Sequence, residues 1–97
     1  MKREELIAFL QNYKEVLHKK YNIQKIIIFG SYAQGTNTEK SDIDIAIEMP
    51  EANYSILFQI KDELENKLHR SVDIVRLRKR MNRFLLTHIK NDGIVVK

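Results

Sequence analysis

The sequence predicts a single small α/β (α+β) domain, residues 1–97, in which helices pack on one face of a mixed β-sheet. Segments with helical spacing and segments with strand spacing alternate along the chain, which is typical of this fold class. Ninety-seven residues leave room for one domain only. Asp42 to Glu48 also alternates strictly, with isoleucines on one face and Asp42, Asp44, Ala46 and Glu48 on the other, as expected for a strand with one buried face.

The first half of the chain indicates a helix, a strand, a loop and then the alternating strand. Arg3 to about Lys20 has apolar residues at three- and four-residue spacing, which predicts an amphipathic helix ending near Asn22. Lys25 to Phe29 is a short β-branched run that stops at Gly30 and predicts a buried strand. Ser31 to Ser41 contains Gly, Ser, Thr and Asn and predicts a turn and a loop.

The second half indicates two further helices and one or two strands. Tyr54 to about His69 returns to helical period, and Ser71 to Leu77 predicts a strand with Asp73 in its middle. Lys79 to Asn91 predicts a last helix, and Ile94 to Val96 a short final strand.

The composition excludes several classes of protein and site. The chain has no cysteine, so disulfides, thiolate metal sites and cysteine nucleophiles are absent. No apolar run approaches the roughly 18 residues of a membrane span, and no apolar segment of signal-peptide length follows the N-terminus. We therefore expect a cytoplasmic protein without membrane contact. The net charge of +4 is too small to identify a nucleic-acid binder.

The most informative pattern joins Gly30-Ser31, a spacer of ten residues, and Asp42-Ile43-Asp44. Carboxylates two residues apart on a strand share a face, with Cβ atoms about 6–7 Å apart. Two such charges repel each other, and a divalent cation relieves the repulsion; oxygen ligands favour Mg²⁺ or Mn²⁺. A glycine lets backbone N–H groups approach a phosphate closely, and Ser31 adds a hydroxyl donor.

Asp73 is a third candidate ligand. If its strand pairs beside Asp42–Glu48, three carboxylates meet on one face, which suits two-metal nucleotidyl transfer. The alternatives are that Asp42 and Asp44 belong to a solvated strand face, and that Asp73 pairs with a nearby basic residue such as Arg70.

These motifs resemble those of polymerase-β-like nucleotidyltransferases. The run Ile28 to Gly35, followed by Ser41-Asp42-Ile43-Asp44-Ile45, is similar to the minimal nucleotidyltransferase (MNT) family. The resemblance covers roughly Ile23 to Gly93. It implies a nucleotidyltransferase-like fold, ATP as substrate and two Mg²⁺ ions. Family members are commonly antitoxins that pair with a HEPN-type ribonuclease toxin.

The resemblance also assigns roles to residues. Asp42, Asp44 and Asp73 match the catalytic, metal-binding carboxylates, and Asp73 would also help to deprotonate the acceptor hydroxyl. Gly30 and Ser31 match the turn that holds the triphosphate. The family activity is transfer of AMP from ATP to a tyrosine of the toxin. The chain departs from the family at Gln34, where arginine is frequent, and this weakens one contact to phosphate.

The segment Lys67 to Lys90 carries eight basic residues against a single acid, Asp73. It is either a solvated helix face or a surface for triphosphate, RNA or an acidic partner. Arg76 and Arg78 lie on the strand face opposite Asp73 and are therefore candidates for a partner surface. Tyr32 is expected to be packed in the core, with stacking on a base as the alternative.

Two other functions stay open. In the first, the chain is an antitoxin that neutralises its toxin by binding alone. In the second, it is an enzyme that transfers nucleotides to RNA or a small molecule. Contact with RNA is not favoured, and it predicts strongly salt-dependent binding through the basic segment.

Overall fold

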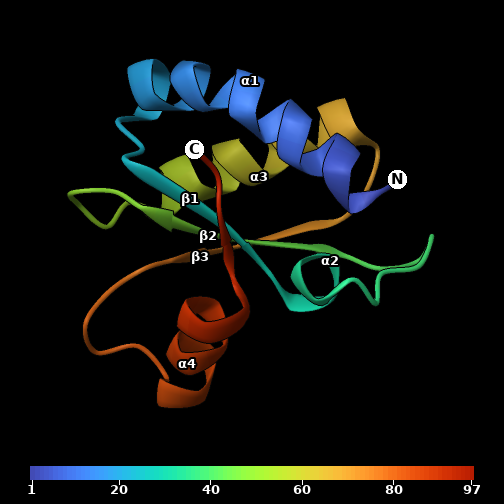
Figure 1. Ribbon diagram of the computed structural model, residues 1–97. Coiled ribbons are helices and arrows are strands. Elements are labelled where there is room, and N and C mark those ends of the chain that lie inside the picture. Colours follow the sequence, from blue (N-terminus) through green and yellow to red (C-terminus); the bar gives the residue numbers. More distant parts are fainter.

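The computed structural model describes residues 1–97 and forms a four-stranded sheet between two layers of helices (Figure 1). The predicted order of elements is confirmed, and a short helix begins at Gly30 and takes up the start of the loop predicted for Ser31 to Ser41. None of the helices combines the length and apolar character needed to cross a membrane. In chain order the elements are α1 (Arg3–Tyr21), β1 (Lys25–Phe29), α2 (Gly30–Gln34), β2 (Ile43–Glu48), α3 (Tyr54–Leu68), β3 (Val72–Arg76), α4 (Arg83–Asp92) and β4 (Ile94–Val95).

The sheet is mixed, as predicted, with the strand order β3-β2-β1-β4. β1 pairs antiparallel with both β2 and β4, whereas β2 and β3 are parallel. Parallel neighbours need a crossover connection, which α3 provides between β2 and β3. β3 and β4 therefore form the two edges of the sheet.

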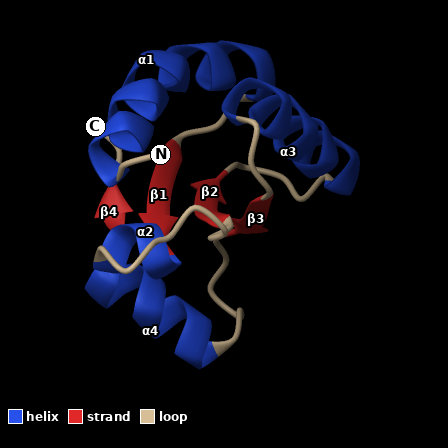
Figure 2. Ribbon diagram, turned by 90° about the vertical axis from the view of Figure 1, so that its right-hand side faces the viewer, coloured by secondary structure: helices blue, strands red, loops and turns tan.

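The two long helices, α1 and α3, cover one face of the sheet (Figure 2). The isoleucines of the alternating strand, Ile43, Ile45 and Ile47, are at most 1% exposed. They belong to a core of 17 buried residues that includes Leu10 of α1 and Leu64 of α3. Each fully buried aliphatic side chain of this kind contributes about 1.5–3 kcal/mol, so this face supplies most of the stability.

The expectation that helices cover only one face needs a correction. α4 lies on the opposite face with the short α2 beside it (Figure 2), and there Ile27, Phe29, Ala46, Met81 and Ile89 form a second, smaller core. The buried residues of α2 belong to the larger core. The physical reason lies in β1, whose apolar run leaves no polar side chain on either face after Lys25. Both faces of such a strand need a cover.

α4 begins at Arg83, later than the predicted start at Lys79. Asn82 caps the N-terminus of the helix and so fixes its start: its Oδ1 accepts hydrogen bonds from the N–H groups of Phe84 and Leu85 at 2.9 and 3.2 Å. These bonds satisfy two N–H groups that the first turn of a helix leaves free.

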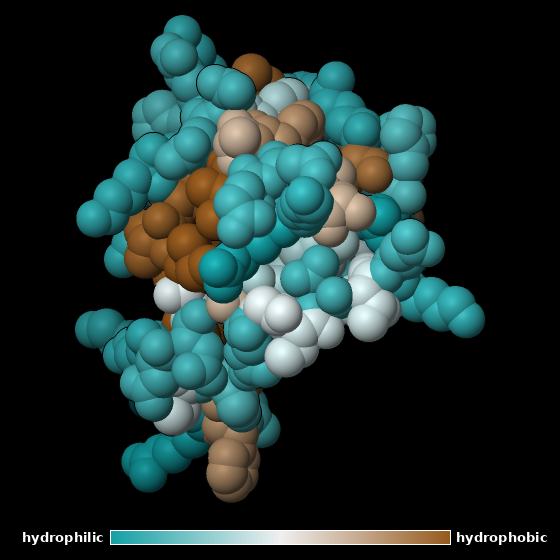
Figure 3. All heavy atoms as spheres, turned by 45° about the vertical axis from the view of Figure 1, so that its right-hand side comes forward, coloured by the Kyte–Doolittle hydropathy of each residue, from teal (hydrophilic) through white to brown (hydrophobic).

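Most of the outer surface is hydrophilic, in line with the 31% of charged residues. Figure 3 shows one face, on which hydrophilic side chains border one large hydrophobic patch and a few smaller ones.

One carboxylate joins α1 to α3. Glu63 of α3 accepts hydrogen bonds from the hydroxyls of Tyr13 and Tyr21 and from Nζ of Lys20, the last at 2.7 Å. Its side chain is only 17% exposed, whereas both members of the surface pair Glu15–Lys19 are more than 70% exposed. Solvent therefore screens the Glu63 interactions less than it screens the surface pair.

We expect Glu63→Ala to lower the free energy of unfolding by about 2 kcal/mol, because it removes three hydrogen bonds and leaves two hydroxyls without their acceptor. Glu15→Ala is the matched control and should change the free energy by less than about 0.5 kcal/mol. Urea denaturation measures both. Equal midpoints for the two variants would contradict this interpretation.

Candidate functional site

The candidate site lies on the face of the sheet that α2 and α4 share. Asp44 of β2 and Asp73 of β3 occupy paired positions in the parallel register. Adjacent strands are about 4.8 Å apart, so these two carboxylates start from neighbouring backbone positions. Asp42 lies two residues before Asp44, just outside β2. The structure thus brings the three predicted aspartates together on one side of the sheet.

Burial and like charge act together on Asp44. Asp44 is half-buried, whereas Asp42 and Asp73 are exposed. Burial raises the pKa of Asp44 above its usual value, and the negative charges of Asp73 and Asp42 raise this pKa further. Asp44 is therefore the carboxylate that gains most from a proton or a cation.

No basic side chain compensates these charges. None of the three aspartates takes part in a salt bridge. Arg70, the alternative partner for Asp73, instead donates a hydrogen bond to the carbonyl of Glu39 at 2.6 Å. A local surplus of negative charge thus persists in a chain whose net charge is +4.

The aspartate side chains do not form a closed cage. No three acidic, histidine or cysteine side chains converge closely enough to hold a metal ion. Like charges repel, so three carboxylates are expected to diverge until a cation lies between them. The strand register brings the three carboxylates near one another, and a bound cation would attract all three.

Gly30 connects the turn after β1 to this carboxylate group. Phe29 pairs with Asp44 across the β1–β2 ladder, and Gly30 follows directly. Its φ of +71° is a left-handed conformation, and a Cβ at this position would overlap the carboxylate of Asp44. Only glycine satisfies both conditions, because it lacks a Cβ. The backbone of the turn therefore lies directly against Asp44.

The rest of the turn is packed against the protein. Ser31 is half-buried, and its carbonyl accepts hydrogen bonds from the N–H groups of Gly35 and Thr36. Tyr32 is fully buried in the larger core, which confirms packing and excludes stacking of its ring on a base. Gln34, at the departure from the family, is exposed.

Sequence reasoning missed one residue at this turn. Arg3, from the first turn of α1, donates a hydrogen bond from Nη1 to the carbonyl of Ala33 at 3.2 Å. Arg3 and Ala33 are 30 positions apart in the chain, so no local spacing could have indicated the contact. The guanidinium satisfies a carbonyl at the C-terminal end of α2 and holds the turn to α1.

We expect Gly30→Ala to destabilise the protein more than Gly35→Ala does. Both glycines have positive φ, which costs an alanine about 1 kcal/mol at either position. Only at Gly30 does the added Cβ overlap Asp44, since the nearest atom at Gly35 is Nη1 of Arg3 at 3.8 Å. Urea denaturation gives the difference, and equal losses would contradict a tight contact between Gly30 and Asp44.

We expect Asp44→Asn to stabilise the metal-free protein at neutral pH, because it removes a charge that burial and its neighbours disfavour. The raised pKa means that the folded state binds the proton more tightly than the unfolded state. The stability of the parent protein therefore falls as pH rises from the ordinary pKa of 3.8 through the raised value.

The advantage of Asp44→Asn should accordingly be full at neutral pH and shrink as pH falls through this range. Urea unfolding of both proteins at several pH values measures it. Glu65→Gln is the control, and it should lower the stability at neutral pH, because hydrogen bonds from Lys61 and Val72 lower the pKa of Glu65 and favour its charged form. A pH-independent difference for Asp44→Asn would contradict the electrostatic interpretation.

Known proteins are similar to this chain in both sequence and fold. Residues 11–97 match the family described as polymerase beta, nucleotidyltransferase. A Methanocaldococcus jannaschii protein, named as a candidate protein adenylyltransferase, is 37% identical over 95 residues, 95% of each chain. Protein adenylyltransferase MntA of Thermococcus cleftensis is 33% identical over 73 residues, 74% of each chain.

A solved structure supports the same assignment. It is a toxin–antitoxin crystal structure with AMP-PNP, with a TM-score of 0.75 and 29% identity. The similarity covers 90% of this chain and 72% of the other. The resemblance predicted from the motifs is confirmed: the chain belongs to the polymerase-β nucleotidyltransferase family and is a nucleotidyltransferase.

Proposed function

We propose that this chain transfers AMP from ATP to a hydroxyl, most simply that of a tyrosine, on a partner HEPN-type toxin, and so acts as its antitoxin. The observation that carries this proposal is the uncompensated group of Asp42, Asp44 and Asp73 beside the turn at Gly30. The relatives named as protein adenylyltransferases support a protein as acceptor. The similar toxin–antitoxin structure supports ATP and a toxin as ligands.

The three aspartates fit a magnesium site chemically. They offer only oxygen donors, which Mg²⁺ prefers, and no basic residue competes for them. Asp42, Asp44 and Asp73 would hold the ions. Bound Mg²⁺ neutralises charge on the triphosphate and on the attacking oxygen in reactions of this class.

Other groups of the chain would orient the triphosphate and accept a proton. Backbone N–H groups at Gly30 and Ser31, with the hydroxyl of Ser31, would orient the triphosphate. The acceptor hydroxyl attacks the α-phosphorus, the bond to the β-phosphate oxygen breaks, and pyrophosphate leaves. Asp73 is exposed and belongs to the edge strand β3, and it would accept the proton of the attacking hydroxyl.

The decisive test compares ATP labelled at the α-phosphate with ATP labelled at the γ-phosphate, with Mg²⁺, cell protein and total RNA. We expect α-label on a protein band and none on RNA. Asp44→Asn should reduce the labelling at least about 100-fold, because it would remove one of the three carboxylates that would hold the ions. Asp62→Asn, on the exposed surface of α3, is the control and should label normally.

Other outcomes point to other functions. Label from the γ-phosphate would indicate kinase chemistry, and α-label on RNA would indicate an RNA acceptor. An Asp44→Asn variant that labels nothing yet still protects cells from the toxin would indicate an antitoxin that acts by binding alone. Each of these results would overturn the proposed transfer as the basis of the antitoxin effect.

A further inference from the structure

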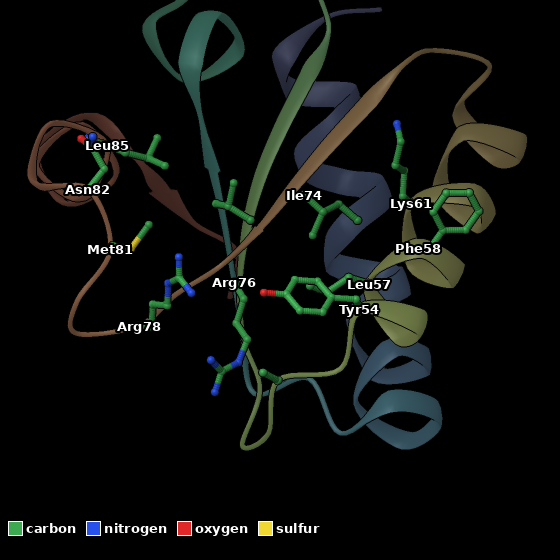
Figure 4. Close-up of a pocket in the computed structure, with 12 residues that line it drawn as sticks. Tyr54, Leu57, Phe58, Lys61, Ile74, Arg76, Arg78, Met81, Asn82 and Leu85 are labelled. Carbon is green, nitrogen blue, oxygen red and sulfur yellow. The ribbon is translucent and has the colours of Figure 1, made fainter.

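A groove of about 520 Å³ runs along the free edge of β3; none of the three aspartates lines it, but Ile74 and Val75, the two residues after Asp73, do. Residues from α3 form one wall, and the start of α4 forms the other (Figure 4). Eight of its twelve lining residues are hydrophobic, which is unusual for an open surface of a chain with 31% charged residues. The ones used below are Tyr54, Phe58, Lys61, Ile74, Val75, Arg76 and Arg78.

The backbone at the floor of the groove is open for pairing. Ile43 donates to the carbonyl of Ser71, and Leu77 donates to that of Ile47, so odd-numbered residues of β3 bond to β2. The N–H and C=O groups of even-numbered residues therefore point away from β2, toward the free edge. Such an edge is a ready template for another strand.

Part of this edge is already covered by side chains. The N–H of Val72 donates to Oε2 of Glu65 at 2.9 Å, and its carbonyl accepts from Nζ of Lys61 at 2.6 Å. No such bond covers Ile74 or Arg76, the next two residues that point outward. The open stretch thus begins at Ile74 and coincides with the groove.

The walls of the groove combine aromatic rings with positive charge. Tyr54 and Phe58 are 78% and 69% exposed, and the Tyr54 ring extends from α3 toward β3 (Figure 4). The guanidinium of Arg76 donates from Nη2 to the carbonyls of Met49 and Pro50 only at 3.4 and 3.5 Å, and its buried Nε has no partner, so no carboxylate neutralises its charge. Arg78 lies exposed at the mouth of the groove.

These charges decide between the classes of occupant. A second copy of the chain would bring Arg76 and Arg78 against their own counterparts, and like charges would oppose this pairing. RNA would neutralise the charge, but it offers no backbone that matches the alternating N–H and C=O groups of Ile74 and Arg76. An extended polypeptide with acidic and apolar side chains satisfies the backbone, the apolar walls and the arginines together.

We propose that this groove binds an extended, acidic and partly apolar segment of a partner protein, which adds to the free edge of β3 as a fifth strand. The segment would follow the strand that carries Asp73, since Val75 lines the groove on the same face two residues later. The partner would thereby be held beside the aspartates. Only the identification of this partner as the acceptor of AMP rests on the proposed function.

The direct test uses the ¹⁵N-labelled full chain and a short peptide in which valine and glutamate alternate. We expect binding to shift the amide signals of Ile74 and Arg76 and to slow their hydrogen exchange. A peptide with lysine in place of glutamate should bind roughly tenfold more weakly, because it repels both arginines. No protection of these two amides by the glutamate peptide, or equal binding of both peptides, would overturn the proposal.

Variants locate the binding in the groove. Arg78→Glu and Phe58→Ala change exposed side chains and should each weaken the glutamate peptide roughly five- to tenfold. Lys90→Glu reverses the same charge on α4 outside the groove and should leave the affinity unchanged. An equal effect of Lys90→Glu and Arg78→Glu would overturn specific docking in favour of general charge attraction.

Further measurements distinguish peptide docking from AMP transfer, from RNA binding and from self-association. Asp44→Asn should bind the peptide normally, so a failure of AMP transfer and a failure of docking are distinguishable. Shifts at Ile74 and Arg76 with single-stranded RNA but not with the peptide would replace the proposal by an RNA site. Concentration-dependent dimerisation of the free chain, lost in Arg78→Glu, would replace it by self-association.

Discussion

The parallel pairing of β2 with β3 is the constraint from which the site follows. It sets Asp44 beside Asp73 and leaves their carboxylates, with that of Asp42, on a face without a basic partner. Parallel pairing requires a crossover, so the length and position of α3 follow from the same arrangement. The repulsion within the group costs stability, and the large core on the other face of the sheet offsets this cost.

One face of the sheet therefore stabilises the fold, and the other presents the aspartates. The face under α1 and α3 contains the buried isoleucines of β2 and the connection through Glu63. The other face has a smaller core under α4, and the aspartates lie next to it, where β1 turns into α2. A charged site of this kind is tolerable because the packing that stabilises the chain lies on the far side of the same strands.

Much of this arrangement could be predicted from the sequence. The alternation in Asp42–Glu48 correctly separated the buried isoleucines from the aspartates, and the spacing of the motif identified the family. The position of α4 was missed, although the uninterrupted apolar run of β1 indicates a strand covered on both faces. The contacts of Gly30 with Asp44 and of Arg3 with Ala33 join distant residues, and no local pattern encodes them.

The place of β3 at the edge of the sheet affects how firmly Asp73 is held in position. Edge strands open more easily than interior ones, because neighbours hold them on one side only. Asp44 belongs to an interior strand, whereas Asp73 moves with the edge. Of the three aspartates on this face, Asp73 is thus the one that an edge strand positions. A strand laid along the outside of β3 would turn that edge into an interior, so the arrival of a partner and the positional order of Asp73 would be thermodynamically linked.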